Sequence, residues 1–413
     1  MARSVGPYVV GPMTTHERPS FTFGIEEECF LVSPWTRALV SEPPRQLLDE
    51  CRGALGERVS AEYQRSQIEF ATNICASMSD ARTQLARSRN VIATIASRYG
   101  LMPIAASTHP FTSWSTQRHT DKERYNKIAD DLQAVGRRMV VGGMHVHVGI
   151  DDNEQRIFVM NEIRCYLPIL LALSTSSPFW QGENTGLKSY RTSINDATPR
   201  KGIPERFASW SDYWSTVGTL VRSGVIEDAT KIWWDLRPSA RFPTLELRIT
   251  DICPLVDDAL CIAALFRCLC RCLLRRNREE RGLSNHPLLL LNENRWRAQR
   301  YGLEHGFIDL HHGKVVTSAA LLDDLLELIR EDAEYFDSIA EVGHARTILA
   351  RGTSADRQVA LYRQQLDCGF SPSRGLRTVV DQLIIETVTG TDNVSSTQGR
   401  ATSITPSLHP GQA

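Results

Sequence analysis

Four segments of this chain alternate apolar and polar residues with a period of two, the pattern of strands that bury one face. They are Phe21–Val32, Gln67–Asn73, Met139–Ile150 and Thr244–Cys253. The polar positions in these segments carry many carboxylate, imidazole and guanidinium groups. The pattern therefore predicts a sheet with one core face and one polar face, combined with helices in an α+β fold.

The segments outside these strands have mainly helical periodicity, and the last third of the chain is predicted to be mostly helical. The expected helices are Ser79–Tyr99, Lys122–Val135, Glu154–Ser174, Asp257–Arg276, Ala319–Arg330, Ala355–Leu366 and Leu376–Thr387. We expect one domain over residues 20–389, after a loose leader (1–19) and before a polar tail (390–413) that lacks residues to bury.

Length and charge narrow the classes of function. The chain has 413 residues, 42% of them hydrophobic, which is enough for a sizeable core. Its 47 basic and 48 acidic residues give a net charge of -1, so we expect neither nucleic acid nor membrane as a partner. No signal peptide is predicted in the first twenty residues, and the apolar stretch Leu255–Leu274 contains four charged residues, which favours a buried helix over a membrane span.

The ten cysteines are scattered along the chain, without paired C-x-x-C knuckles. Cys268, Cys270 and Cys272 fall within the apolar helix, where buried packing explains them better than a zinc site. Reduced thiols indicate a cytoplasmic protein.

Two acidic clusters belong to the predicted strands. Glu26 and Glu28 project from one face of the first strand, where neighbouring like charges are unfavourable unless they are solvated or share a cation. Glu27 points to the other face, and the pattern offers it no partner. Glu62 precedes the second strand, on which Glu69 takes a polar position.

The other two strands add imidazoles and an acid–base pair. His145 and His147 leave the same face of a strand that begins with two glycines, and Glu246 and Arg248 share a face of the last strand. In a single sheet these groups would meet on the polar face. Carboxylate oxygens with one or two imidazoles suit Mg²⁺ or Mn²⁺, which can bridge phosphate oxygens.

Basic residues outside the acidic set would hold anions. Arg248 could neutralise a transferred phosphate, with Lys188, Arg191, Arg237 and Arg241 available for nucleotide or substrate carboxylates. The chain has no glycine-rich phosphate loop, so ATP would bind through metals on the sheet.

In combination these motifs resemble the bacterial glutamate–cysteine ligase type 2 group of carboxylate–amine ligases. The resemblance rests on Phe23–Glu28, Gln67–Glu69, Gly143–Gly149 and Leu245–Asp251, with similarity continuing to Leu376–Asp381. Within the wider glutamine synthetase-like superfamily, Gly143–His147 and Glu246–Arg248 look like the Gly-Met-His-x-His and Glu-x-Arg strands of glutamine synthetase.

The resemblance implies a funnel-like antiparallel sheet with helices packed on its outer face. It implies ATP and Mg²⁺ (or Mn²⁺) as cofactors and an ATP-dependent ligase that joins L-glutamate to L-cysteine, or to another amine, through a γ-glutamyl phosphate. Activity with cysteine is often weak in this group, and a homodimer is common among similar proteins.

Residue roles follow from the same resemblance. Arg248 and Glu69 would be catalytic, and Arg248 would contact the transferred phosphate with Lys188, Arg237 and Arg241 nearby. Substrate would meet Arg191, Tyr190 and Trp233. The metal ligands or near-ligands would be Glu26, Glu28, Glu62, Glu69, His145, His147 and Glu246.

Other functions fit parts of the pattern. A kinase on the same scaffold would use ATP and metals without forming an amide. A metal-binding protein without turnover would keep the same ligands. Zinc hydrolysis through His145 and His147 fits less well, because the face offers many hard oxygens.

Overall fold

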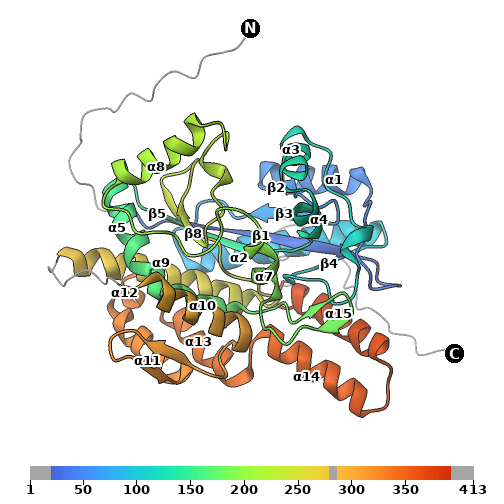
Figure 1. Ribbon diagram of the computed structural model, residues 1–413. Helices are drawn as coiled ribbons and strands as arrows, with labels where there is room; N and C mark the ends of the chain where they lie inside the picture. The colour runs from blue at the N-terminus through green and yellow to red at the C-terminus, as the bar shows by residue number, and fades with distance from the viewer. Residues whose placement is uncertain (1–19, 279–285, 392–413) are drawn as a thin grey trace, which may run out of the picture.

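The structure is a computed structural model that describes residues 20–278 and 286–391 (Figure 1). The predicted leader (1–19) and all but the first two residues of the predicted tail (390–413) lie outside the described residues.

The central element is an antiparallel sheet of seven described strands in the order β2-β3-β1-β5-β9-β8, with β4 paired to the far end of β1. The long strand β1 lies in the middle of the sheet (Figure 1). The strands are β1 (Phe23–Val32), β2 (Val59–Ala61), β3 (Gln67–Ala71), β4 (Met102–Ile104), β5 (Met144–Gly149), β8 (Leu236–Pro238) and β9 (Thr244–Leu247).

The predicted alternation sets the two faces of this sheet. Phe23 and Ile25 of β1 are buried with Val146 of β5 and Leu245 of β9 in one continuous apolar core. The side chains between them project to the opposite face, which is polar. The prediction of an antiparallel sheet with one core face, within an α+β fold, is confirmed.

Helices cover the core face. The helices α2 (Met78–Arg98), α5 (Asn153–Ile163) and α9 (Val256–Arg278) pack directly on the strands, and α9 also contacts α6 (Leu167–Ser174) and α13 (Ile339–Arg351). Cys268, Cys270 and Cys272 are buried in this core, as predicted, and all ten cysteines are free.

The remaining helices lie at the edges of the sheet or in the last third of the chain. The C-terminal helices gather below the sheet in the view of Figure 1. The bounds are α1 (Arg45–Leu55), α3 (Glu123–Leu132), α4 (Ala134–Arg138), α7 (Tyr190–Asp196), α8 (Trp210–Arg222), α10 (Leu288–Tyr301), α11 (Ser318–Leu328), α12 (Arg330–Tyr335), α14 (Ser354–Asp367) and α15 (Pro372–Val388).

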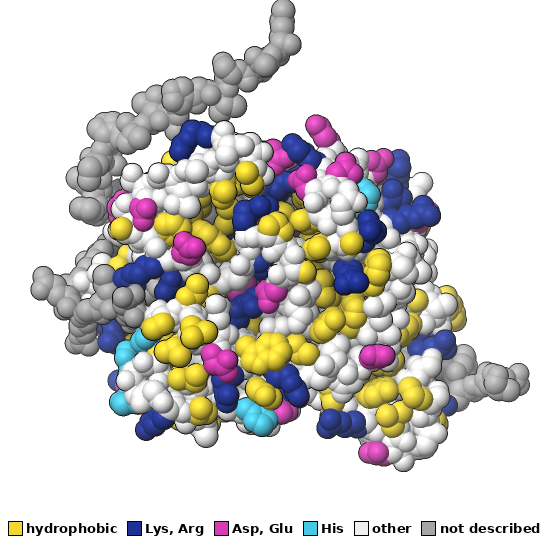
Figure 2. Space-filling model, viewed as in Figure 1, with side chains coloured by type: hydrophobic (Ala, Val, Ile, Leu, Met, Phe, Trp, Pro, Cys, Tyr) yellow, Lys and Arg dark blue, Asp and Glu magenta, His cyan; other side chains and the backbone are white. Residues whose placement is uncertain are grey.

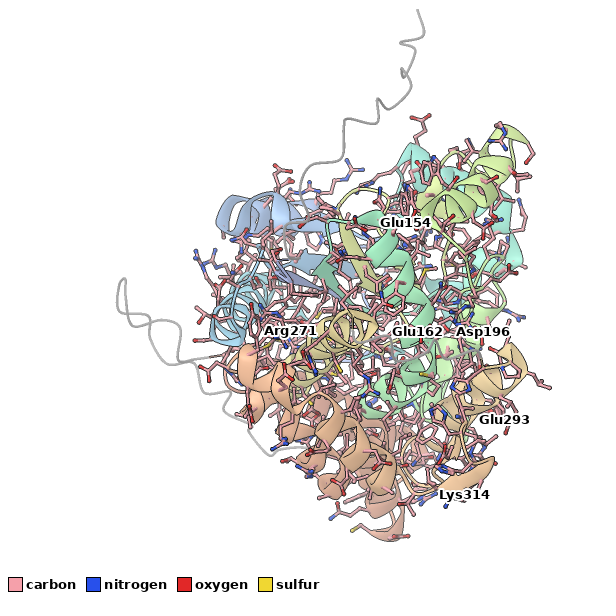
Figure 3. The ribbon with its side chains drawn as sticks, turned by 90° about the vertical axis from the view of Figure 1, so that its left-hand side faces the viewer. Glu154, Glu162, Asp196, Arg271, Glu293 and Lys314 are labelled. Atoms are coloured by element: carbon pink, nitrogen blue, oxygen red, sulfur yellow. The ribbon has the colours of Figure 1, made fainter. Side chains whose placement is uncertain are left out.

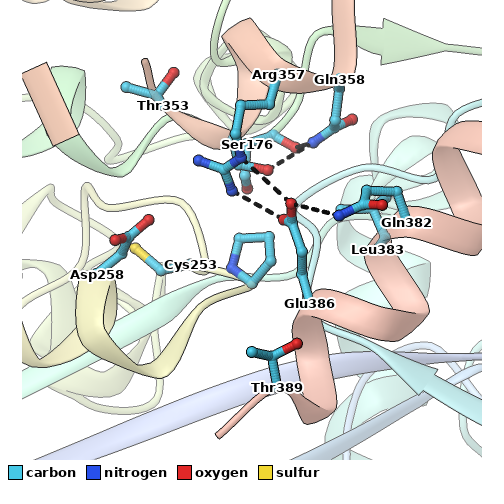
Figure 4. A network of polar contacts seen from close by, with 12 residues as sticks. Ser176, Cys253, Asp258, Thr353, Arg357, Gln358, Gln382, Leu383, Glu386 and Thr389 are labelled. Atoms are coloured by element: carbon cyan, nitrogen blue, oxygen red, sulfur yellow. Dashed lines mark hydrogen bonds and ion pairs between the residues drawn. The ribbon is translucent and has the colours of Figure 1, made fainter. Parts of the chain in front are cut away.

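A polar network fastens the C-terminal helices to the body (Figure 4). Arg357 of α14 donates to Glu386 of α15 at 2.9 and 3.3 Å, and Gln382 donates to the same carboxylate at 3.1 Å. Gln358 donates to the carbonyl of Ser176 at 2.9 Å. Ser176 lies just after α6, so α14 also supports the segment that leads towards the polar face.

Several predicted boundaries were too long. The strand expected over Met139–Ile150 begins only at Met144, and the one expected over Thr244–Cys253 ends at Leu247. The second ends there because the amides of Arg248 and Ile249 both donate to the carbonyl of Asp235, which breaks the regular ladder.

Two predicted helices are interrupted. The helix expected over Lys122–Val135 divides at Gln133, whose backbone has φ 49°, into α3 and α4. The helix expected over Glu154–Ser174 contains a 3-10 turn at Arg164–Tyr166, just before Pro168. This segment, Asn153–Ser174, is apolar and long enough to cross a membrane, but 83% of its most apolar window is buried inside the protein.

Two small hairpins lie apart from the main sheet. They are formed by β6 (Phe179–Trp180) with β7 (Glu183–Asn184) and by β10 (Phe307–Asp309) with β11 (Lys314–Val316). On the face shown in Figure 2, acidic and basic side chains are interspersed, in keeping with the near-zero net charge.

Candidate active site

The polar face of the sheet lines a cavity of about 620 Å³. Strand register builds it: Glu28 of β1 lies opposite Glu69 of β3, and Glu26 lies opposite His145 of β5. His147 in turn lies opposite Glu246 of β9. The cavity is lined by all seven residues of the predicted metal set, namely Glu26, Glu28, Glu62, Glu69, His145, His147 and Glu246.

Three carboxylates converge in the cavity. One oxygen each of Glu28, Glu62 and Glu69 lies within 4.8 Å of the other two. The amide of Gly143 donates to Glu28 at 2.7 Å, and the hydroxyl of Ser60 donates to Glu69 at 2.7 Å. In the described part of the chain, none of the three forms an ion pair with lysine or arginine.

Their crowding changes how they titrate. Burial and the charges of Glu28 and Glu69 raise the pKa of Glu62 well above its usual value. Burial and the charges of Glu26 and Glu28 raise the pKa of Glu69 to about 7. A cation placed among the three oxygens would reverse both effects, and their hard oxygen donors suit Mg²⁺ or Mn²⁺.

The two histidines hold Glu26 beside this cluster. His145 Nδ1 and His147 Nε2 each lie 3.4 Å from an oxygen of Glu26. Burial alone would raise the pKa of Glu26, but the two imidazoles keep it well below its usual value. Burial and the charge of Arg248 lower the pKa of His145, whereas for His147 burial is outweighed by Glu26 and Glu246, which raise it.

Glu246 has a different environment from the other carboxylates. Arg237 of the neighbouring strand β8 donates to it at 2.9 and 3.2 Å, and Arg248 forms a second ion pair with it. Burial opposes ionisation, but these two guanidinium groups hold the pKa of Glu246 far below its usual value. In this arrangement Glu246 is the counterion of two arginines, and its role as a metal ligand stays a prediction.

Arg191 enters the cavity from α7. Its Nη1 and Nη2 donate to the carbonyls of Ile249 and Arg248, each at 3.2 Å. The fully buried Asp251 fixes the surrounding segment by accepting bonds from Ser177 and Ser189 at 2.7 and 2.9 Å. Among the described residues, the Nε atoms of Arg191 and Arg248 have no hydrogen-bond partner.

Arg191 lies directly against the backbone of Gly143. A Cβ at this position would lie 2.3 Å from Arg191 Nη2. The glycines before His145 therefore let one strand contact both Glu28 and Arg191, the close approach predicted from the sequence.

Two predicted residues do not reach the cavity. Lys188 is held by Glu304 and Asp356 at 2.6 and 2.5 Å, and the ring of Tyr190 packs 5.7 Å from that of Trp180. Neither lines the cavity, so the geometry gives no support to nucleotide contact by Lys188 or substrate contact by Tyr190. The other predicted binding residues, Arg191, Trp233, Arg237, Arg241 and Arg248, do line it.

Sequence reasoning missed other lining groups, including Tyr125, Asn195 and Lys201. Tyr125 is on α3, and its hydroxyl donates to the carbonyl of Ala61 at 3.1 Å. Asn195 lies in the last turn of α7, the helix that carries Arg191, and Lys201 follows that helix. None of them lies in a strand with a two-residue period, so no pattern marked them.

The sequence matches a known protein family. The family model described as glutamate–cysteine ligase family 2 matches residues 22–372. The chain belongs to this family. The resemblance inferred from its strand motifs is therefore confirmed, and the matched range includes every predicted site residue.

Other members of glutamate–cysteine ligase family 2 align with this chain over most of their own length. Proteins named "Putative glutamate--cysteine ligase 2" from Rhodospirillum rubrum and Jannaschia sp. are 51% and 47% identical over 90% and 88% of this chain, which is 96% of each relative.

Solved structures share the fold at low sequence identity. A glutamate–cysteine ligase of Francisella tularensis, in complex with AMP, has a TM-score of 0.62 at 12% identity, over 92% of this chain and 95% of its own. A bifunctional glutathione synthetase of Pasteurella multocida has a TM-score of 0.65 at 16% identity over 89% of this chain. This chain spans 52% of that larger protein.

Proposed function

We propose that this protein is an ATP-dependent carboxylate–amine ligase that joins the side-chain carboxylate of L-glutamate to an amine, with L-cysteine as the first candidate. The observation that carries the proposal is that one cavity holds both a carboxylate cluster, Glu28, Glu62 and Glu69, here called its acidic end, and the guanidinium groups of Arg191 and Arg248, here called its basic end. Metal-bound ATP and an anionic substrate need both ends at once.

The acidic end fits a divalent cation. Its three carboxylate oxygens lie close together with no ion pair to lysine or arginine among the described residues, and the pKa values of Glu62 and Glu69 are raised by burial and by the neighbouring carboxylates. We assign Glu28, Glu62 and Glu69 as the ligands of Mg²⁺ or Mn²⁺, with Glu26, His145 and His147 beside them. When bound, the cation would supply charge neutralisation to the phosphates of ATP.

The basic end would bind the negative charge that moves during the reaction. Arg248 lies beside the acidic end and could contact the transferred phosphoryl group, while Glu246, itself paired with Arg237, holds its position. Arg191, fixed by two backbone carbonyls, could bind a substrate carboxylate. Phosphorylation of the glutamate side chain would give an acyl phosphate that an amine attacks.

The comparisons support this function at the level of the family. The matched family takes its description from glutamate–cysteine ligase, and the Francisella ligase with the same fold was solved with AMP. The ten free cysteines are consistent with a cytoplasmic protein. The lining residues do not select cysteine over other amines, so the amine is the finer part of the proposal.

The test is release of phosphate from Mg-ATP with glutamate and a panel of amines that includes cysteine, with products identified by mass spectrometry. We expect ADP and an amide in equal amounts. ADP with a phosphorylated substrate and no amide would instead indicate a kinase, and no turnover with any pair would contradict the proposal.

A further inference from the structure

Lys201 lies on the cavity wall in the segment between α7 and α8. Its side chain is only 8% exposed. The backbone on either side has positive φ values, 56° at Arg200 and 98° at Gly202. An arginine adopts this conformation only where its surroundings enforce it, and such strain gathers at functional sites.

Backbone hydrogen bonds enforce this conformation. The carbonyl of Arg200 accepts the amide of Trp233 at 3.1 Å, and that of Gly202 accepts the amide of Asp235 at 2.9 Å. The turn is thereby fastened to the chain that enters β8. Lys201 is thus presented to the cavity from a fixed position, unlike a lysine on a free surface loop.

The carboxylate facing Lys201 already has a partner. Lys201 Nζ lies 3.7 Å from Asp235 Oδ1, longer than a hydrogen bond. Arg295 of α10 donates to Asp235 at 2.6 Å and also to Asp196, which Figure 3 labels at the end of α7. Asp235 is therefore the hydrogen-bonded counterion of Arg295, and Lys201 lies near this carboxylate without a hydrogen bond to it.

The other charged groups around Lys201 are cations. Arg191 faces it from α7, Arg248 from the chain after β9 and Arg295 from α10. Burial, together with these three guanidinium groups, outweighs Asp235 and lowers the pKa of Lys201 to about 7. At neutral pH the Lys201 side chain is therefore a neutral amine in a substantial share of the molecules.

A ligase needs such a group for its second step. The amine substrate arrives mainly as an ammonium ion, which has no electron pair for attack on an acyl phosphate. Glu28, Glu62 and Glu69 belong to the candidate metal site, Glu246 is paired with Arg237 and Arg248, and both imidazoles lie against Glu26. The arginines cannot act as bases at neutral pH.

We propose that Lys201 is the base that deprotonates the incoming amine, an inference that rests on the proposed ligase function. Lys201 Nζ takes one proton from the substrate ammonium. The freed amine forms the C–N bond as the bond between the acyl carbon and the phosphate oxygen breaks. Phosphate leaves with the electron pair of that bond and carries away the second proton of the nitrogen.

The test compares two nucleophiles in the Lys201→Arg variant. Arginine keeps the positive charge but cannot accept a proton. With glutamate and Mg-ATP, amide formation with cysteine near pH 7 should fall by about 100-fold or more, the usual contribution of a general base. Hydroxylamine is already unprotonated at neutral pH, so hydroxamate formation should stay close to the wild-type rate, which also shows that the variant is folded.

The pH profile gives a second readout. In the wild type, amide formation should decline as the pH falls below about 7, while hydroxamate formation should lack this decline. Lys201→Met should behave like Lys201→Arg towards cysteine. Lys231→Arg is the matched control, because Lys231 is similarly buried, with a side chain 7% exposed, but lies outside the cavity.

The possible results distinguish a failure of the Lys201 proposal from a failure of the proposed ligase function. Equal loss of amide and hydroxamate in Lys201→Arg would overturn the proposal and make Lys201 a positioning residue, with the ligase function intact. Retained amide formation would also overturn it. If the wild type forms neither product, the ligase function fails as well.

Discussion

Strand β1 places neighbouring carboxylates on opposite faces of the sheet, in two different electrostatic environments. Glu27 points into the core, where it is fully buried with Arg89, which donates to it at 2.6 and 2.8 Å. Glu28 points into the cavity, where its carboxylate meets Glu62 and Glu69. One carboxylate has its cation within the protein, and the next meets other carboxylates.

This difference distinguishes a carboxylate with a structural role from one that is positioned to bind a ligand. A buried carboxylate is tolerated when the fold supplies its cation and further hydrogen bonds, as Arg89 does by also binding the carbonyl of Cys253 at 2.7 Å. A cluster without such a cation is unfavourable until an external one arrives. Among the described residues Glu28 forms no ion pair with arginine, whereas Glu27 does, and this contrast is what marks Glu28 as a candidate ligand.

The largest expected effect is on turnover in Glu28→Gln. The amide keeps the size of the side chain and can still accept the Gly143 N–H, but it removes one anionic metal ligand. We expect ATP turnover to fall by about 1000-fold or more, the upper range for loss of one preorganised charged group. The melting temperature without metal should be unchanged or higher, because repulsion decreases. An active Glu28→Gln enzyme would show that the metal site is misassigned.

The matched variant Glu27→Gln should show the opposite pattern. Arg89 would remain buried without its counterion, which typically destabilises a fold by about 3–5 kcal/mol. Urea unfolding measures this loss, and Mg²⁺ titration of the folded variant should give wild-type affinity. Near wild-type stability would remove the distinction between the two faces.

Arg248→Lys tests the basic end of the cavity. An ammonium group cannot contact Glu246 and a phosphate with the forked geometry of a guanidinium group. We expect kcat to fall by roughly 10- to 100-fold, as for loss of a group that orients a reactive centre. Steady-state kinetics provide the measurement. An effect on KM alone would instead indicate ground-state binding.

Gly143→Ala should have a smaller effect that links the two ends of the cavity. The added methyl group would collide with Arg191, and overpacking of this kind typically costs about 1–3 kcal/mol. We expect a lower melting temperature and a higher KM for glutamate. Gly53→Ala is the control, because a Cβ there meets nothing within 4 Å.

The smallest effect concerns pH in the metal-free protein. The folded-state pKa of Glu69, about 7, exceeds the unfolded value of about 4.3. Its contribution to stability is therefore fully present below about pH 4.3 and is lost as pH rises through about 7. Thermal melts in EDTA should show this decline, and Mg²⁺ or Glu69→Gln should flatten it. An unchanged slope in Glu69→Gln would contradict the assignment.

The site residues on the strands could be predicted because the alternation of apolar and polar residues is a local feature of the sequence. A two-residue period predicts which side chains share a strand face. It correctly grouped Glu26 with Glu28 and His145 with His147. Placing these strands in one sheet then brought the metal set together. The same pattern put Glu27 on the core face without indicating Arg89, which lies 62 residues away on α2.

The remaining features depend on contacts that no local pattern records. Lys188 has the residue type of a phosphate ligand, yet Glu304 and Asp356 hold it elsewhere. Lys201 had no periodic context, and its position depends on long-range backbone bonds to the segment before β8. Arginine and lysine side chains are long enough that tertiary packing, rather than strand register, decides where their charges lie.

The register of the central strands also limits how this family can change over evolution. Inserting or deleting one residue in β1 or β5 would turn every subsequent cavity side chain into the core, so these strands tolerate substitution but not a change in length. Loops at the cavity rim, such as residues 239–243, are free of this restriction. New amine preferences should therefore arise by remodelling of the rim loops, while the catalytic strands keep a constant length.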